Sequence, residues 1–204
     1  VSDFNITNLE KFIPLQLKKI KLNKSYYSFL LNQSGGIIDD IILSYINLHD
    51  NFYFYIVYNA SRKTHDEKIF TEFTSLYKIL DKNCLFALQG PFSYKVLNKI
   101  IKIPDNIKFL EYFHTTFDNQ TLLITRSGYT GEDGFEISIP KQIAENFLNI
   151  ILKDVDVSLC GLGSRDSLRV EAGLSLYGHE LNENISPIEA GLIWAIDKER
   201  LKDN

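Results

Sequence analysis

The chain has 204 residues, of which 45% are hydrophobic and 24% charged, so it can bury a substantial core as one large domain or two small ones. Its formal net charge of -4 argues against a general nucleic-acid-binding protein. No apolar run approaches the roughly 20 residues that a membrane helix needs, and residues 1–25 lack a signal-peptide pattern, so we expect a soluble protein.

Cysteine and histidine are too sparse for a disulfide framework or a metal site. Cys84 and Cys160 are the two cysteines, and neither has a second Cys or His at metal-binding spacing. A reducing compartment fits this usage best. The chain begins with Val1 and contains no methionine, so we expect that it is not a complete, unprocessed translation product.

The first third of the chain predicts a β-meander. Residues 26–33 and 37–46 are rich in Tyr, Phe, Leu and Ile and predict two strands joined through Ser34-Gly35-Gly36. A Gly-Gly pair can supply the positive φ angles of a tight hairpin turn. A third strand is expected at 52–58, after the polar turn 47–51.

Helical and strand patterns alternate in the rest of the chain. Ile69, Phe70 and Phe73 belong to an apolar stripe that predicts a helix over 66–80. This order of elements indicates an α+β fold with mainly antiparallel sheets and packed helices, and residues 1–204 are expected to form one core of two interwoven subdomains without a clear boundary. The other expected elements are a strand at 84–88, a helix at 92–102, strands at 109–114, 121–126 and 134–139, and helices at 141–152 and 164–172.

Two adjacent aspartates, Asp39 and Asp40, stand in the predicted second strand. Alternate residues of a strand share a face, so Asp39 is expected beside Ile37 and Ile41, and Asp40 on the opposite face between two further isoleucines. Whichever face meets the core, its carboxylate must find donors, raise its pKa or face a polar cavity. The pattern does not choose between the two aspartates, and an edge strand whose aspartates bond neighbouring backbone N–H groups fits it too.

Three glycines at a spacing of three, Gly128, Gly131 and Gly134, predict a loop whose backbone passes close to another group. A strand follows this loop rather than a helix, which excludes a dinucleotide-binding loop. Glu136 falls on the less apolar face at the start of that strand. Its carboxylate suits the adjacent N–H donors of a pterin or guanine edge, and a solvated strand face is the alternative.

Arg165 is the third candidate. Ser164 fits an N-cap and places Arg165 in the first helical turn, where a cation opposes the helix dipole by a few tenths to about 1 kcal/mol. Asp166 and Arg169 form an i,i+3 pair that relieves the repulsion between the two arginines. Arg165 then needs an external anion, either in a structural ion pair, for instance with Glu136, or from a ligand.

Five runs of residues occur in an order that resembles one known family. They are Tyr27-Ser28 with Leu31-Asn32 and 34–40, Val57-Tyr58-Asn59-Ala60-Ser61, Ala87-Leu88-Gln89-Gly90-Pro91, 128–137, and 161–173 continued by Leu176-Tyr177-Gly178 and 185–192. Together they resemble the aminomethyltransferase family, the tetrahydrofolate-dependent T-proteins of the glycine cleavage system, over most of residues 25–196. Tyr58 stands where that family usually has a small or aliphatic residue. The family normally has several dozen residues before the position of Val1 and a β-rich domain after about residue 200, so the chain resembles a folate-binding core truncated at both ends.

The resemblance implies an enzyme that takes the aminomethyl group from the lipoyl arm of the H-protein, releases ammonia and leaves methylene-tetrahydrofolate. The implied partner is the lipoylated H-protein, with no nucleic acid and no membrane, and the implied compartment is the mitochondrial matrix or the bacterial cytoplasm. By position in the motifs, Asp39 matches the catalytic carboxylate beside the folate nitrogens N5 and N10. The implied cofactor-binding positions are Tyr27 and Tyr129 as aromatic walls, Asn59 as a polar pterin contact, and Glu136 with Arg165 at the pterin edge. Asp39, Glu136 and Arg165 are therefore expected to converge around a reduced pterin.

Two other functions share much of this pattern. A tetrahydrofolate-dependent demethylase of the same superfamily would keep the folate residues and differ in its acceptor cavity. A folate-binding assembly factor for iron–sulfur proteins would carry a cysteine-containing motif near the end of this region, and residues 195–200 contain no cysteine. A folate-binding remnant without catalysis is the remaining alternative.

Overall fold

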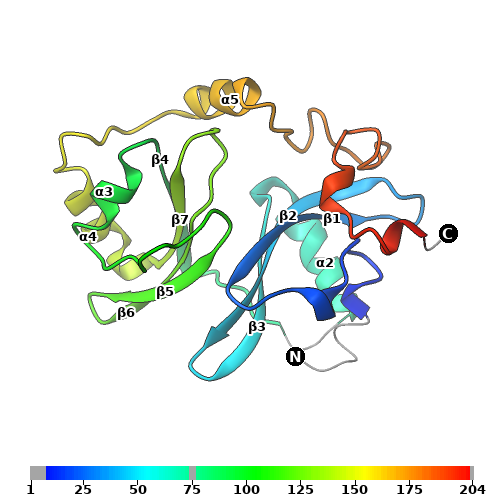
Figure 1. Cartoon of the computed structure of the whole chain (residues 1–204), viewed down its shortest axis with the longest axis horizontal. Coiled ribbons are helices and arrows are strands. Elements are labelled where there is room, and N and C mark those ends of the chain that lie inside the picture. Colours follow the sequence, from blue (N-terminus) through cyan, green and yellow to red (C-terminus); the bar gives the residue numbers. More distant parts are fainter. Residues whose placement is uncertain (1–7, 74–76, 203–204) are drawn as a thin grey trace. The chain divides into compact units, whose positions relative to one another are not determined.

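The structure, a computed structural model, describes residues 8–73 and 77–202. The chain divides into two compact units: unit 1 comprises residues 1–78 and 175–204, and unit 2 comprises residues 79–174 (Figure 1). Each unit contains its own antiparallel sheet with helices beside it, which confirms the predicted α+β class. None of the helices in the described ranges is long and apolar enough to cross a membrane.

Unit 1 is built on the predicted meander. Its strands β1 (Lys24–Leu31), β2 (Ile37–Leu48) and β3 (Asn51–Tyr58) pair antiparallel in the order β1-β2-β3, with β2 in the centre. The turn between β2 and β3 is tighter than predicted: His49 and Asp50 form it, with φ of 52° and 60°. Two consecutive residues with positive φ match the right-handed twist of a two-residue hairpin.

The two glycines before β2 have different roles, which corrects the prediction that both supply a positive φ. Gly35 alone has a φ in the left-handed region, +82°. Gly36 is needed for space, because a Cβ there would lie 1.9 Å from the backbone oxygen of Glu183. At this position the backbone of β2 begins directly beside the returning C-terminal segment, and the Ile37 N–H donates to the Ile185 carbonyl (3.0 Å).

Both faces of this sheet are covered. On one face lies α2 (Lys63–Phe73), which Figure 1 shows beside β1 and β2. Its residues Ile69 and Phe70 pack with strand residues and with apolar residues of the segment 9–20, which includes η1 (Leu17–Lys19). On the other face, residues of the segment 177–195, which ends in η3 (Ile193–Ala195), cover Phe29. The remaining short helices of unit 1 are η2 (Ala60–Arg62) and η4 (Arg200–Lys202).

The predicted helix over 66–80 differs from α2 at both ends. The helix begins three residues earlier, at Lys63, and residues 77–80 have no regular structure, while 74–76 lie outside the described residues. Tyr77 is 43% exposed, so the apolar stripe has no surface to pack on there. Short helices depend on such packing for their stability.

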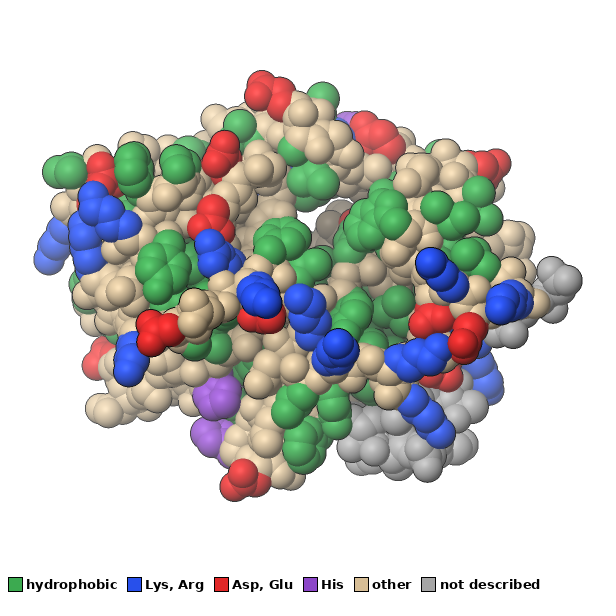
Figure 2. All heavy atoms as spheres, viewed as in Figure 1, with side chains coloured by type: hydrophobic (Ala, Val, Ile, Leu, Met, Phe, Trp, Pro, Cys, Tyr) green, Lys and Arg blue, Asp and Glu red, His purple; other side chains and the backbone are tan. Residues whose placement is uncertain are grey.

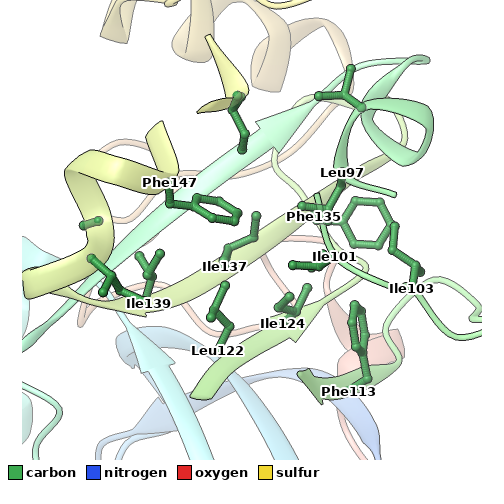
Figure 3. Close-up of a cluster of buried hydrophobic side chains, with 14 of the residues drawn as sticks. Leu97, Ile101, Ile103, Phe113, Leu122, Ile124, Phe135, Ile137, Ile139 and Phe147 are labelled. Atoms are coloured by element: carbon green, nitrogen blue, oxygen red, sulfur yellow. The ribbon is translucent and has the colours of Figure 1, made fainter. Parts of the chain in front are cut away.

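Unit 2 is built on a four-stranded antiparallel sheet in the order β4-β7-β6-β5. Figure 3 shows its core, in which Phe147 lies over the row Phe135, Ile137 and Ile139 of β7. All four of these side chains are 0% exposed. The strands are β4 (Asn83–Gln89), β5 (Tyr112–Phe117), β6 (Gln120–Thr125) and β7 (Gly134–Pro140), and the helices are α3 (Ser93–Leu97), α4 (Lys141–Ile151) and α5 (Leu162–Glu171).

Three predicted boundaries in unit 2 are wrong for local reasons. The helix predicted at 92–102 is only α3, because the Asn98 side chain accepts the Ile103 N–H (3.2 Å) and turns the chain. The strand predicted at 109–114 begins later, because Leu110 has a φ of 59°, outside the strand region. The last helix has its N-cap at Gly161 instead of Ser164.

Charges are mixed on the visible surface. Figure 2 shows acidic and basic side chains close to one another on this face, with apolar side chains among them. This mixture is in line with the small net charge of -4.

Candidate functional site

The strand that carries the two aspartates contains an irregularity that alternation could not predict. The pairing of β1 with β2 shifts by one residue, so that Leu30 lies opposite Asp39 and Leu31 opposite Ile37. As a result, Ile37 packs with the cluster around Phe29, on the face opposite the one that contains Leu30. The prediction that Ile37 and Asp39 share a face is therefore wrong, because a β-bulge breaks the alternation.

Asp39 is completely buried and Asp40 is partly buried in the central strand, which excludes the edge-strand interpretation. Asn59, which directly follows β3 and is the N-cap of η2, holds both of them. Its backbone N–H donates to Asp39 Oδ2 (3.0 Å), and its side-chain Nδ2 donates to Asp39 Oδ1 (2.9 Å) and Asp40 Oδ1 (2.7 Å). The Tyr27 hydroxyl donates to Asp40 Oδ2 (3.2 Å). Four of the residues singled out from the sequence, Asp39, Asp40, Asn59 and Tyr27, thus form one hydrogen-bonded group.

Tyr27 also lies in an aromatic stack. Its ring is stacked on Trp194, with ring centroids 5.5 Å apart and an interplanar angle of 24°, and meets Phe29 edge-on at 5.2 Å. Trp194 is 67% exposed, so this stack forms an aromatic surface that solvent can reach.

The pKa of Asp40 is raised to about 6. Burial is the main cause and the charge of Asp39 adds to it, whereas the hydrogen bonds from Asn59 and Tyr27 act in the opposite direction. Asp40 therefore changes its charge closer to neutral pH than an ordinary aspartate does.

A third carboxyl group, that of Asp66, belongs to this group and was missed from the sequence. Asp66 lies in the first turn of α2 and is 0% exposed. Its pKa is raised to about 8, first by burial and then by Asp39, which acts as a hydrogen-bond partner and as a nearby negative charge. The helix dipole favours a negative charge in the first turn by only about 0.3–1 kcal/mol, less than one pKa unit, so burial and Asp39 dominate. The signal was present in the sequence, since Asp66 stands on the apolar stripe with Ile69 and Phe70.

The positive charge of Arg62 lowers the pKa of Asp66. Its guanidinium is also engaged elsewhere: Nη2 donates to Glu183 Oε1 (2.8 Å), and Cζ lies 4.9 Å from the centroid of the Tyr177 ring. Part of its charge is therefore balanced by Glu183, which limits its effect on Asp66.

In unit 2, the three loop glycines pass close to the chain itself. A Cβ on Gly128 or Gly134 would lie 1.7 or 2.4 Å from the Gln89 side chain, and one on Gly131 would lie 2.8 Å from the Ala172 Cβ. Gln89 Nε2 donates to the backbone oxygens of residues 127 (3.1 Å) and 135 (3.3 Å). Gln89 therefore ties the two ends of the loop together.

Glu136 follows this loop in β7 and is held by a chain of hydroxyl groups. The Ser127 hydroxyl donates to Glu136 Oε2 (2.7 Å), and Thr125 Oγ1 lies 2.7 Å from Ser127 Oγ. Because Ser127 donates its hydrogen to Glu136, the Thr125 hydroxyl is the donor in the second bond. Across the loop, Arg126 binds Asp133 through two hydrogen bonds (2.9 and 2.8 Å), and this bond is the main reason that the pKa of Asp133 is lowered.

Arg165 is exposed, and its guanidinium Cζ lies 5.0 Å from the centroid of the Tyr129 ring. Because α5 begins at Leu162, the Arg165 N–H already bonds to the carbonyl of residue 161 (3.3 Å), and the predicted penalty from the first-turn dipole is smaller. The ion pair of Asp166 with Arg169 is confirmed (2.8 Å). Among the described residues, Arg165 makes no ion pair with Glu136.

The predicted site residues fall in both units. Tyr27, Asp39 and Asn59 belong to unit 1, and Tyr129, Glu136 and Arg165 belong to unit 2. Their convergence on one pterin stays a prediction. Within unit 2, the Ser127 hydroxyl uses one acceptor position of Glu136 Oε2, and the Arg165 guanidinium lies over the Tyr129 ring. Unit 2 therefore contains a carboxylate acceptor and a planar cation, both of which can bind a polar heterocycle. No group of three His, Cys, Asp or Glu residues suited to a metal ion occurs in the ranges 8–73 and 77–202.

The chain as a whole has counterparts among known proteins. Residues 6–200 match the family described as the GCVT N-terminal domain, and the chain belongs to this family.

The relatives described next are named aminomethyltransferases. The chain is 38% identical over 214 residues to the mitochondrial aminomethyltransferase of Dictyostelium discoideum, covering 95% of this chain and 52% of the relative. It is 35% identical over 198 residues to the aminomethyltransferase of a Picosynechococcus species, covering 94% and 53%. The crystal structure of the glycine cleavage system aminomethyltransferase T from Bartonella henselae is similar with a TM-score of 0.85 and 36% identity, covering 97% of this chain and 54% of that one. The chain thus spans about half the length of the relatives it matches.

Proposed function

We propose that this chain is the folate-binding part of an aminomethyltransferase, which transfers the one-carbon unit from the aminomethyl group on the lipoyl arm of the H-protein to tetrahydrofolate and releases ammonia. Family membership and the shared name of the relatives support this proposal. The observation that carries it is the complete burial of Asp39 and its two hydrogen bonds from Asn59. By its place in the motif, Asp39 would be the catalytic carboxylate.

Asp39 would act on the folate nitrogens. Tetrahydrofolate supplies the nucleophilic nitrogen for this transfer, and the iminium-like carbon that reacts with it carries positive charge. A fixed carboxylate beside that charge stabilises it and can accept or relay a proton. Asn59 contributes by fixing both oxygens of Asp39, since positioning supplies much of the barrier reduction in transfer reactions.

Glu136 and Arg165 would bind the pterin. Oε2 of Glu136 is fixed by Ser127, so the carboxylate is oriented to accept adjacent pterin N–H groups in a bidentate manner. Tyr129 supports the Arg165 guanidinium from one side, and the planar cation can then contact the heterocycle. Tyr27, within its aromatic stack, would form a wall of the site.

Calorimetric titration of the chain with tetrahydrofolate tests the proposal. We expect Arg165→Ala to weaken binding, whereas Lys102→Ala, which removes an exposed cation of the same unit, leaves it unchanged. Equal affinity of the Arg165→Ala variant would remove Arg165 from the site.

Turnover with aminomethyl-lipoyl H-protein, measured as ammonia release on a version of the protein as long as its relatives, tests Asp39. We expect Asp39→Asn to lower turnover by orders of magnitude and to retain most of the folate affinity, with the exposed Asp50→Asn as a control. Folate binding without ammonia release by the unmodified protein would favour the demethylase alternative. The relatives include mitochondrial and bacterial proteins, and we propose the mitochondrial matrix or the bacterial cytoplasm as the compartment.

A further inference from the structure

Asp66 is a buried acid that the proposed reaction does not use. Its side chain is 0% exposed, and within the described part of the chain neither of its oxygens accepts a hydrogen bond from an N–H or hydroxyl group. The His65 Nδ1 lies 3.5 Å from Asp66 Oδ1, and the His65 side chain is 46% exposed. A buried carboxylate without donors is costly, so the neutral, protonated form is favoured at this place.

Asp39 is the acceptor that suits this proton. Each of its two oxygens accepts one hydrogen bond from Asn59, and a carboxylate oxygen can accept two. One acceptor position on each oxygen therefore remains for a further donor. Asp39 is also the group with the largest specific effect on Asp66 after burial itself, and its effect favours protonation of Asp66.

The other groups around Asp66 do not remove this preference. Arg62 opposes it, but its Nη2 is bound to Glu183. The titratable and charged groups that act on Asp66 or are acted on by it are Asp39 and Asp40 of β2, Arg62 of η2, its neighbour His65, Tyr58 of β3 and Tyr177.

We propose that Asp66 is a positioning residue for Asp39: the two carboxyl groups hold one proton, which resides on Asp66 and is donated as a hydrogen bond to the Asp39 carboxylate. This inference deepens the proposed function, because Asp39 is the carboxylate assigned there to the folate nitrogens. Asp66 of α2 and Asn59, the N-cap of η2, then both bind Asp39 and fix its orientation while leaving it charged. Loss of the shared proton at alkaline pH places two negative charges side by side and releases Asp39 from this orientation.

Carbon-13 NMR of aspartate carboxyl groups in the ligand-free chain, titrated from pH 4 to pH 10, tests the shared proton directly. We expect one carboxyl resonance with a midpoint near pH 8, in line with the pKa of Asp66 of about 8. This step should disappear in Asp66→Asn and remain in Asp50→Asn, which alters an exposed aspartate of the same unit. In Asp39→Asn the step should move down by about one pH unit or more, because the neighbouring charge is gone. The absence of an aspartate that titrates above pH 7, or a step that persists in Asp66→Asn, would overturn the proposal.

Turnover separates this inference from the proposed function and distinguishes positioning from a merely structural role. Asp66→Asn keeps a neutral donor, so its ammonia release from aminomethyl-lipoyl H-protein, measured on the version of the protein as long as its relatives, should match the unmodified protein at pH 7 and should not fall at pH 9. The unmodified protein should lose kcat several-fold between these values with little change in tetrahydrofolate affinity, and Asp66→Leu should have a low kcat at both. If turnover falls with the same pH dependence in Asp66→Asn, the positioning role is wrong although the proposed function stands. If the NMR step is present and the unmodified protein releases no ammonia, the proposed function fails while the shared proton is retained.

Discussion

Replacement of Gly36 by alanine should destabilise unit 1 because of a backbone collision. The added Cβ would lie 1.9 Å from the Glu183 oxygen and 2.6 Å from its carbon, so this segment must retreat by about 1.5 Å to reach ordinary van der Waals contact. Such a shift breaks the hydrogen bonds from Asn32 Nδ2 to the Glu183 oxygen (2.9 Å) and from the Ile37 N–H to the Ile185 oxygen (3.0 Å). Two lost bonds, one of which leaves a buried N–H without an acceptor, cost about 2–4 kcal/mol.

The control for this substitution lies next to it. Gly35→Asn places a side chain at φ +82°, where nothing lies within 4 Å of the new Cβ, and asparagine tolerates this region at a cost of about 1 kcal/mol or less.

Urea unfolding followed by tryptophan fluorescence measures both variants, because Trp194 is the only tryptophan of the chain and stacks on Tyr27 within unit 1. We expect a lower midpoint with an unchanged slope for Gly36→Ala. If Gly36→Ala loses no more stability than Gly35→Asn, the steric explanation is refuted.

Three further outcomes are expected. The pKa of Asp66 is raised from 3.8 to about 8 in the folded chain, so between these values the folded state keeps a proton that the unfolded state releases. The free energy of unfolding of the unmodified chain, relative to that of Asp66→Asn, should therefore fall as the pH rises from 4 to 8. Urea midpoints of the two proteins that run parallel over this pH range would contradict the reasoning. Ser127→Ala removes the hydrogen-bond donor to Glu136 and should weaken tetrahydrofolate binding by about 1–2 kcal/mol in calorimetry. Ser127→Thr keeps a hydroxyl group and should bind as the unmodified chain does. Unchanged affinity in the alanine variant would show that Ser127 has no role in folate binding. Phe147→Ala should lower the free energy of unfolding, followed by circular dichroism, by about 3–5 kcal/mol. The control Phe109→Ala, which alters a 60% exposed ring, should lower it by about 0.5 kcal/mol or less. Similar losses in the two variants would argue against the core shown in Figure 3.

Strands with strong local patterns could be predicted well, and boundaries set by single side chains could not. The meander of unit 1 and the helix α4 follow from runs and stripes of apolar residues that each have a surface to pack on. The early end of α3 depends on the Asn98 side chain, and the late start of β5 depends on the positive φ of Leu110. Neither effect has a periodic signal in the sequence.

In the candidate site too, some features could be predicted from the sequence and others could not. An acidic residue among isoleucines indicated a special carboxylate, but the choice of Asp39 over Asp40 came from the family resemblance, and the bulge beside Leu31 that changes the face of Ile37 has no signature in the sequence. Asp66 could have been found, because an aspartate on an apolar helical stripe needs an explanation of its own. Ser127 could not, since it acts only through its contact with Glu136.

The interruption of unit 1 along the chain affects the order in which the protein can assemble during synthesis. Unit 2 is one continuous stretch, so all of its strands and helices are available once residue 174 has left the ribosome. Unit 1 must wait, because the main-chain bonds from Ile37 to Ile185 and from Asp197 to Pro14 join segments synthesised far apart. Until then Phe29 and Ile37 lack the cover that residues 177–195 provide, and this nascent sheet exposes apolar surface of the kind that chaperones recognise.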